Sequence, residues 1–234
     1  MFAVYKREMR SYFVSAVGYV FLAVLLLLSA AVFSVTTLLA GSCDISTYFT
    51  VMLFVLMVAL PVLTMKLFSE ERKLKTEQLL LTAPISIGGM VFAKFLAAFT
   101  VFFGANLLCS LSYISLFVYA KPEPGVILGN IIALTLVGAA FIAVGMFVSS
   151  LTENQLAAAI GTFGILLFFL ALGFLSPVIP YYPVRFVLNW FSILSRYNNF
   201  TNGFFDFAAL FYYLSVCFVF LFITCRIYER RRYA

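Results

Sequence analysis

The sequence predicts an all-α membrane protein with six transmembrane helices, and two observations carry this prediction. Of the 234 residues, 65% are hydrophobic and 10% are charged, with a mean hydropathy of +1.11, so a soluble surface cannot be built. The apolar residues also form long continuous runs, unlike the short alternating segments of a β-barrel. A helix needs about 20 such residues to cross roughly 30 Å of hydrocarbon. The runs of that length are residues 17–39, 48–67, 91–119, 126–149, 156–175 and 207–225.

The basic residues predict how these spans are oriented. Of the 15 lysines and arginines, all except Lys121, Arg185 and Arg196 lie at the two termini or beside the same ends of the spans. This bias places both termini and residues 69–84 in the cytoplasm. Because the basic residues border the membrane and do not gather on a soluble face, we expect membrane lipid as a partner and no nucleic acid.

The segment before the first span has amphipathic spacing. Its apolar side chains fall on one arc and its basic ones on the neighbouring arc, which predicts a helix lying in the inner interface. The alternative is a positively charged flank that only orients the first span, and both readings can hold together. The apolar arc comprises Phe2, Tyr5, Met9, Tyr12, Phe13 and Ala16, and the basic arc Lys6, Arg7 and Arg10.

Residues 69–84 form the longest charged interruption of the chain, between the second and third spans. Lys73, Glu77 and Leu81 share one helical row, and Pro84 ends the segment, which predicts a short amphipathic helix at the cytoplasmic face. Its three consecutive leucines favour a groove on another protein over a merely solvated loop, the alternative. Pro61 is expected to kink the preceding span, and Lys94 to extend its amine back to the headgroups.

Polar and small residues inside the spans indicate helix packing. Asn106 and Ser110 stand four residues apart, a spacing that joins helices more often than it lines a substrate path. Pairs of small residues in the fourth and fifth spans permit close approach of neighbouring helices. These pairs are Ala139 with Ala143, Gly145 with Ser149, and Ala157 with Gly161.

The external side between the fifth and sixth spans is unusual. Residues 184–194 are apolar but too short to span, which predicts a re-entrant or interfacial helix after a proline-rich stretch. Aromatic residues here predict an outer interfacial belt. They are Tyr181, Tyr182, Trp190 and Tyr197.

The sequence lacks the residues that known catalytic templates need. It has no histidine and no phosphate-binding Gly-x-x-x-x-Gly-Lys segment, and its four cysteines have no metal spacing. Every carboxylate falls outside the predicted spans, which disfavours proton-coupled transport and intramembrane catalysis. We therefore expect no enzyme, no metal and no cofactor bound by this chain, and an energy supply from a partner.

These motifs together resemble the permease subunits of ABC-2-type ABC transporters, in the branch of the gliding-motility and nitrous-oxide-reductase-maturation permeases. The resemblance runs end to end and is most specific in residues 68–85, followed by Lys94-Phe95. Weaker matches are residues 5–19, residues 149–155, the Asn199-Phe-Thr-Asn-Gly203 motif and the closing arginines. In related chains a histidine often precedes the Asn-Phe motif; here Tyr197 lies in that neighbourhood.

The resemblance implies that residues 1–234 form a single transmembrane domain in the bacterial cytoplasmic (inner) membrane. A second permease copy or paralogue would complete a homo- or heterodimer, and separate ATP-binding subunits would hold ATP and Mg. It implies ATPase coupling by Glu70, Glu71, Thr76, Glu77, Leu80, Pro84, Thr152, Glu153 and Asn154. It implies an external gate at Pro177, Pro180, Trp190, Asn199, Phe200 and Gly203.

The functional hypothesis is then an ATP-driven permease, coupled through residues 69–84, that exports a hydrophobic or amphiphilic substrate. The alternative is a membrane scaffold that transmits ATPase strokes to an envelope process such as gliding motility without passing a solute. The sequence identifies neither the cargo nor the direction of transport.

Overall fold

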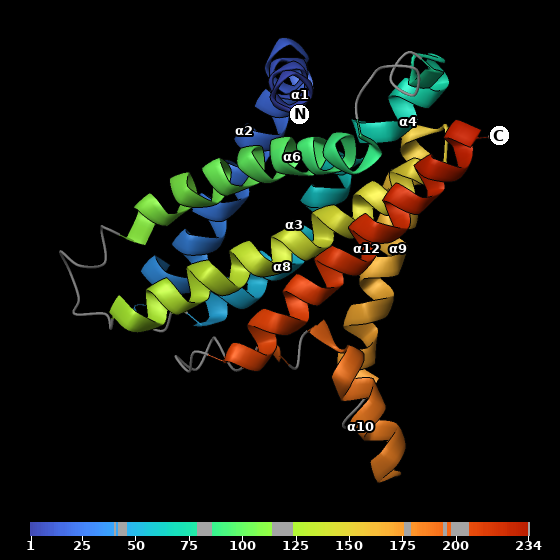
Figure 1. Cartoon of the computed structure of the whole chain (residues 1–234). Coiled ribbons are helices and arrows are strands. Elements are labelled where there is room, and N and C mark those ends of the chain that lie inside the picture. The colour runs from blue at the N-terminus through green and yellow to red at the C-terminus, as the bar shows by residue number, and fades with distance from the viewer. Residues whose placement is uncertain are drawn as a thin grey trace.

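The computed structural model is all-helical over the residues that it describes, which are 1–39, 41, 46–78, 86–113, 124–175, 179–193, 196–197 and 206–233 (Figure 1). The α-helices are α1 (Phe2–Val14), α2 (Ala16–Phe33), α3 (Ser46–Thr64), α4 (Lys66–Lys73), α6 (Ile87–Ser110), α8 (Pro124–Leu151), α9 (Gln155–Leu175), α10 (Tyr182–Phe191) and α12 (Phe207–Tyr233). A π-helical turn (Ser34–Leu39) extends α2, and a 3₁₀ turn (Leu111–Tyr113) extends α6.

Six helices in the described part are long and apolar enough to cross a membrane, which confirms the predicted number of spans. The candidate spans are Ala16–Leu39, Ser46–Lys73, Ile87–Tyr113, Pro124–Leu151, Gln155–Leu175 and Phe207–Arg232. The third begins four residues before the predicted start, and its predicted last residues, 114–119, lie outside the described part. The second and sixth continue beyond their predicted ends, because polar residues there remain helical where the helices leave the apolar layer.

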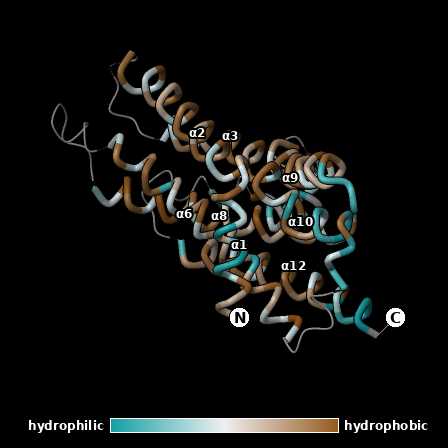
Figure 2. The backbone as a smooth tube through the Cα atoms, turned by 90° about the horizontal axis from the view of Figure 1, so that it is seen from above, coloured by the Kyte–Doolittle hydropathy of each residue, from teal (hydrophilic) through white to brown (hydrophobic). Residues whose placement is uncertain are grey.

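Helix α8 is the centre of the bundle. Of the residues in its most apolar stretch, 72% are buried, against 22% in each of α9 and α12. Its neighbours are α3, α6, α9 and α12, so it crosses the middle of the molecule in Figure 1. Figure 2 shows brown, apolar spans and teal residues gathered at α1 and toward the C-terminus.

Glycines on α8 let two neighbouring helices approach. A Cβ atom at Gly145 would lie 2.2 Å from Thr64 Oγ1 of α3, and one at Gly138 would lie 2.2 Å from the Phe102 ring of α6. Both distances are far below van der Waals contact, so a side chain at either position would force Thr64 or Phe102 to shift. The predicted small residue at position 145 therefore has a packing role.

Polar contacts also join the spans. Asn106 Nδ2 donates to Thr135 Oγ1 at 3.0 Å and ties α6 to α8, as expected of a residue that joins helices. Ser29 Oγ of α2 lies 2.7 Å from Tyr48 Oη of α3, and this hydrogen bond joins the two helices. Tyr197, predicted for the outer interfacial belt, is instead fully buried and donates to the Phe49 carbonyl at 3.0 Å. The prediction for Tyr197 was wrong because a distant backbone carbonyl satisfies its hydroxyl inside the bundle.

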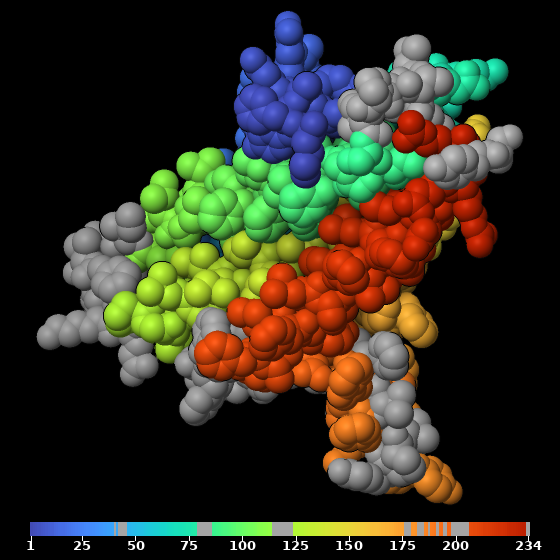
Figure 3. Space-filling view, viewed as in Figure 1, coloured from blue at the N-terminus to red at the C-terminus, as the bar shows by residue number. Residues whose placement is uncertain are grey.

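Helix α1 lies against α6 and the start of α2, as Figures 1 and 3 show. The chain leaves α1 at Ser15, whose backbone is extended, and a Cβ atom at Gly18 would lie 2.5 Å from the Tyr12 carbonyl oxygen. The predicted amphipathic helix exists, but its buried face consists of Val4, Glu8 and Tyr12. Phe2, on the predicted apolar arc, is 77% exposed, and its contact with lipid stays a prediction.

The predicted helix over residues 69–84 is not continuous. Helix α4 ends at Lys73, and Lys75 has a positive φ of 55°, so the chain turns before Glu77. Lys73 and Glu77 therefore do not share one helical row, and Leu81 lies outside the described part. Glu77 and Gln78 are helical again, and residues 79–85 lie outside the described part.

The short helix α10 stands between α9 and α12 in the chain, where the sequence predicts a re-entrant or interfacial helix. It packs against α9 and projects from the bundle at the end opposite to α4 (Figure 1). Its Trp190 is exposed, as the interfacial belt requires. That α10 re-enters a membrane stays a prediction.

Candidate functional site

Charged side chains concentrate at one end of the bundle, which we call the charged end. Here α1, α4 and the start of α6 meet the last turns of α8 and α12. Its core is a group of four alternating charges, the Lys94 cluster, formed by Arg7, Glu8, Glu71 and Lys94.

Lys94 is the buried centre of this cluster. Only 1% of its side chain is exposed, and its Nζ lies 3.0 Å from both Glu8 Oε1 and Glu71 Oε1. It also donates to the Leu67 carbonyl at 2.7 Å and lies over the Phe68 ring. Lys94 therefore does not reach back to the headgroups as predicted, because two carboxylates and a carbonyl hold it inside the protein.

Arg7 closes the cluster from the more exposed side. Its Nη2 donates to Glu8 Oε1 at 2.7 Å and to Glu71 Oε1 at 2.5 Å. The two cations and two carboxylates balance, so the buried group carries no net charge. Breaking such a cluster by removing one partner leaves an uncompensated charge, which costs about 3–5 kcal/mol when fully buried. The cluster thus fixes α1, α4 and α6 in one relative position.

The pKa values on α1 reflect this arrangement. Burial by itself would raise the pKa of Glu8, but the charge of Lys94 and the hydrogen bonds from Arg7 and Lys94 hold it below its ordinary value. Burial would lower the pKa of Arg7, yet Glu8 and Glu71 raise it. Both groups are therefore charged near neutral pH. Burial raises the pKa of Tyr12, whose neutral hydroxyl donates to the Leu63 carbonyl at 3.2 Å.

The junction of α3 and α4 is held by Ser149 of α8. Its Oγ accepts from the backbone N–H groups of Phe68 and Ser69, each at 3.1 Å, and donates to the Met65 carbonyl at 3.0 Å. Helix α3 continues through Pro61, and the interruption between α3 and α4 lies at Met65. One hydroxyl thus satisfies the backbone groups of the interruption and ties it to α8.

Two arginines bind the short link between α8 and α9. Arg72 of α4 donates to the Leu151 carbonyl at 2.8 Å and pairs with Glu153 at 3.0 Å. Arg231 of α12 donates to the Ser150 carbonyl at 2.8 Å and pairs with Glu77 at 3.2 Å. The two polar links, near residues 69–78 and 149–155, are therefore connected to each other and to the last helix.

Aromatic rings fill the space between these polar contacts. The ring of Tyr228 on α12 lies 4.7 Å from that of Phe68, and Arg231 lies over Tyr228. Phe68 also receives Lys94 on its face. The charged end is therefore one packed unit, and α4 lies at its middle.

The structure brings together most of the residues predicted to contact an ATPase. Glu71 and Glu77 point inward and are paired, while Glu70 faces Lys66 and Thr76 is exposed in the turn after α4. Among the link residues, Thr152 Oγ1 donates to the Asn154 carbonyl, and Asn154 Oδ1 accepts from the Leu156 N–H, which caps α9. Leu80 and Pro84 lie outside the described residues.

The predicted gate residues are described only in part. Trp190 projects from α10, where Arg196 lies 5.8 Å from the centre of its ring, and Pro180 is exposed just before that helix. Pro177, Asn199, Phe200 and Gly203 lie outside the described residues. Their grouping into a gate stays a prediction.

Sequence reasoning missed Arg7, Glu8 and Lys94 as site residues. A signal was present: Lys94 falls inside an apolar helix, and a cation at such depth needs a carboxylate partner. The sequence alone does not select Glu8 and Glu71 as the partners. Among the described residues, no group of three histidine, cysteine or acidic side chains could hold a metal ion.

Comparison with known proteins adds no family to this picture. No protein-family model matches the chain, and no curated protein is significantly similar to it. The composition and the six apolar helices define a multi-pass helical membrane protein.

Proposed function

We propose that this chain is the permease subunit of an ATP-driven transporter of the ABC-2 type, with a separate ATPase bound at the charged end. Of the lysines and arginines that the structure describes, Arg185 and Arg196 lie away from that end, which supports a cytoplasmic orientation for it. The resemblance of residues 68–85 to a coupling segment points to the same surface.

The observation that carries the proposal is the connection of both polar links through α4. A displacement of α4 is passed to α1 and α6 by Lys94, to α8 by Ser149, and to the link before α9 by Arg72. Tightly packed helices move between discrete arrangements and do not deform continuously. A partner that pushes on α4 would therefore move several spans together.

The docking surface is expected to be the turn that follows α4. Leu74 is 64% exposed in this turn, and Lys73 and Lys75 beside it are exposed as well. An exposed leucine flanked by cations fits an apolar pocket with an acidic rim on the partner. Glu71 and Glu77 would position this turn from within and would not touch the ATPase.

The apolar side chains that face away from the bundle support a hydrophobic or amphiphilic substrate. They include Phe211, Phe218 and Phe222 on α12 and Ile160 and Phe168 on α9. Such faces bind lipid tails, a second permease copy or an apolar cargo equally well. Export follows from the family resemblance alone.

The test is co-purification of the ATPase with single variants of the full chain. Leu74→Asp should abolish recovery of a nucleotide-hydrolysing partner while the variant still inserts and melts like the wild type. Trp190→Asp at the opposite end is the matched control and should keep the partner. Normal recovery with Leu74→Asp, or equal loss with both variants, would refute the docking surface.

A force-transmitting scaffold is the second candidate. It is favoured by the polar side chains inside the described spans, such as Asn106 and Ser29, which bond to neighbouring helices and line no described polar path. Both candidates use the same coupling. Movement of lipid or solute in vesicles that contain the chain and its ATPase would support the permease, and hydrolysis without movement would support the scaffold.

A further inference from the structure

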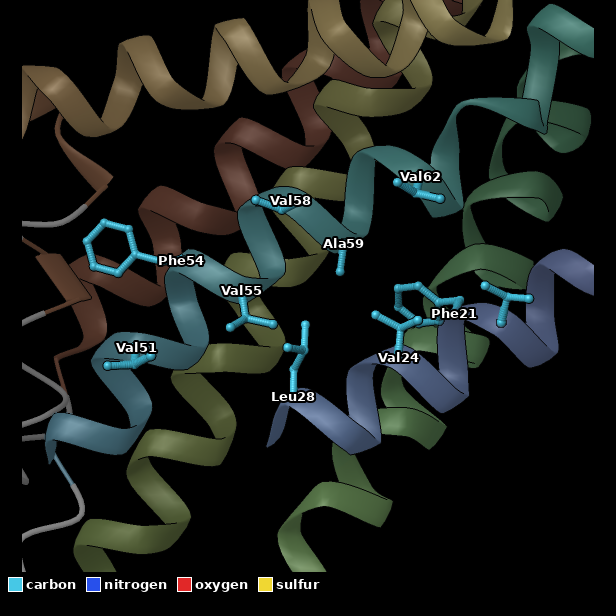
Figure 4. A pocket seen from close by; sticks show the side chains of 10 residues that line it. Phe21, Val24, Leu28, Val51, Phe54, Val55, Val58, Ala59 and Val62 are labelled. Carbon is cyan, nitrogen blue, oxygen red and sulfur yellow. The ribbon is translucent and has the colours of Figure 1, made fainter. Parts of the chain in front are cut away.

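A groove between α2 and α3 is lined entirely by apolar side chains. Its volume is about 500 Å³, and Figure 4 shows side chains of both helices facing the space between them. Residues from α2 include Val20, Val24 and Leu28, and those from α3 include Val51, Val58 and Val62. Most of these side chains are exposed although both helices are candidate spans, so the groove opens toward the membrane.

The groove has the length of one membrane leaflet. Val51 and Val62 mark its ends on α3, and at about 1.5 Å per residue they are separated by about 16 Å. Half of a hydrocarbon core of roughly 30 Å is about 15 Å. A single acyl chain from the leaflet at the charged end therefore fits along it.

A separate polar recess of about 30 Å³ lies on the charged-end side of the groove and shares no lining residue with it. Lys66 follows Val62 by one helical turn, and its Nζ is 3.9 Å from Glu70 Oε2, too far for a hydrogen bond. The hydroxyls of Ser11 and Ser15 bond to no other described residue. The recess is lined by Glu8, Ser11, Tyr12, Ser15, Lys66, Leu67 and Glu70.

We propose that the groove and the recess together bind one aminophospholipid of the phosphatidylethanolamine type. One acyl chain lies in the groove, and the headgroup lies over the mouth of the recess. There the phosphate accepts hydrogen bonds from Lys66, Ser11 and Ser15, and the primary ammonium donates to Glu70. Phosphatidylglycerol has no cation for Glu70, and phosphatidylcholine has no N–H donor, so both fit less well. The site differs from the proposed ATPase docking surface at Leu74, although both use α4, and lipid binding is measured on the chain without the ATPase.

Native mass spectrometry of the full chain tests this site with three lipids that share the same acyl chains. Phosphatidylethanolamine should bind the wild type about threefold to tenfold more tightly than phosphatidylglycerol or phosphatidylcholine, the range for one partly exposed charged hydrogen bond. Glu70→Gln should remove most of this preference, whereas Lys66→Ala should weaken the binding of all three lipids, because they share the phosphate. Lys73→Ala, on the same helix but outside the recess, should keep the preference.

The groove is tested by filling it with a larger side chain. Val58→Trp should weaken first-lipid binding, whereas Val219→Trp, an equally apolar exposed position on α12, should not. In the unmodified protein, phosphatidylethanolamine with a photoreactive acyl chain should label α2 and α3 above the other spans. Equal affinity for the three lipids, or label spread evenly over all exposed spans, would overturn the proposal.

Discussion

Replacing Lys94 with methionine tests the buried charge cluster most severely. Methionine keeps the length and apolar stem of the lysine but leaves Glu8 and Glu71 with Arg7 as their only cation. Their side chains are 11% and 18% exposed, so water compensates little of the lost pairing. We expect the folded state to lose about 3–5 kcal/mol, the cost of breaking a buried ion pair from one side.

The assay is thermal unfolding of the purified chain in detergent. For a chain of this size, a loss of that magnitude lowers the Tm by about 6–20 °C. Lys73→Met is the control, because Lys73 is exposed at the end of α4 and should shift the Tm by less than about 2 °C. A double variant, Lys94→Met with Glu71→Gln, should recover part of the loss. If Lys94→Met melts like the control, the cluster does not stabilise the charged end.

Three further predictions concern the packing and charge of the same region. Gly145→Ala should destabilise the folded protein by about 1–3 kcal/mol through overpacking against Thr64. Gly129→Ala, on the same helix but with open space around it, should be neutral or stabilising. Equal Tm shifts for the two variants would contradict the packing of Gly145 against Thr64. Ser149→Ala should cost about 1–3 kcal/mol of stability, because the backbone N–H groups of Phe68 and Ser69 lose the hydroxyl that accepts from them. Ser150→Ala should cost less, because the Ser150 hydroxyl bonds only within its own helix. A larger Tm loss for Ser150→Ala would disprove the role of Ser149 at the junction of α3 and α4. The pKa of Glu8 is lowered in the folded protein, so its contribution to stability is present at neutral pH and declines as the pH falls below about 4.3. The Tm of the wild type should therefore fall in acid more steeply than that of Glu8→Gln. Parallel profiles of Tm against pH would exclude this linkage.

The spans could be predicted from the sequence because their cause is local. A continuous apolar run needs only the bilayer as its environment, and each of the six runs is helical over its described residues. The small residue at position 145 was also recognisable, since a close helix crossing requires one. Its partner Thr64 was not, because that contact depends on how α3 and α8 pack in the fold.

The interior of the charged end could not be predicted because its contacts are distant in the chain. Lys94 on α6 pairs with Glu8 on α1 and with Glu71 on α4, both distant in the sequence, so no rule of residue spacing reveals the cluster. The turn at Lys75 was missed for a different reason: lysine rarely adopts a positive φ, and the pattern of residues 69–84 is helical throughout. Tyr197 carried the usual marks of an interfacial residue and is buried only because the Phe49 carbonyl accepts its hydroxyl.

Site-specific photocrosslinking in native membranes tests the central claim most directly. A photoreactive residue at position 74, in the exposed turn after α4, should capture a subunit that carries a nucleotide-binding Gly-x-x-x-x-Gly-Lys motif, and the same residue at position 190 on α10 should not. Capture that increases on addition of a non-hydrolysable ATP analogue would support coupling at this end. If position 74 captures no nucleotide hydrolase, or captures it no better than position 190, the chain is not the membrane half of such a motor.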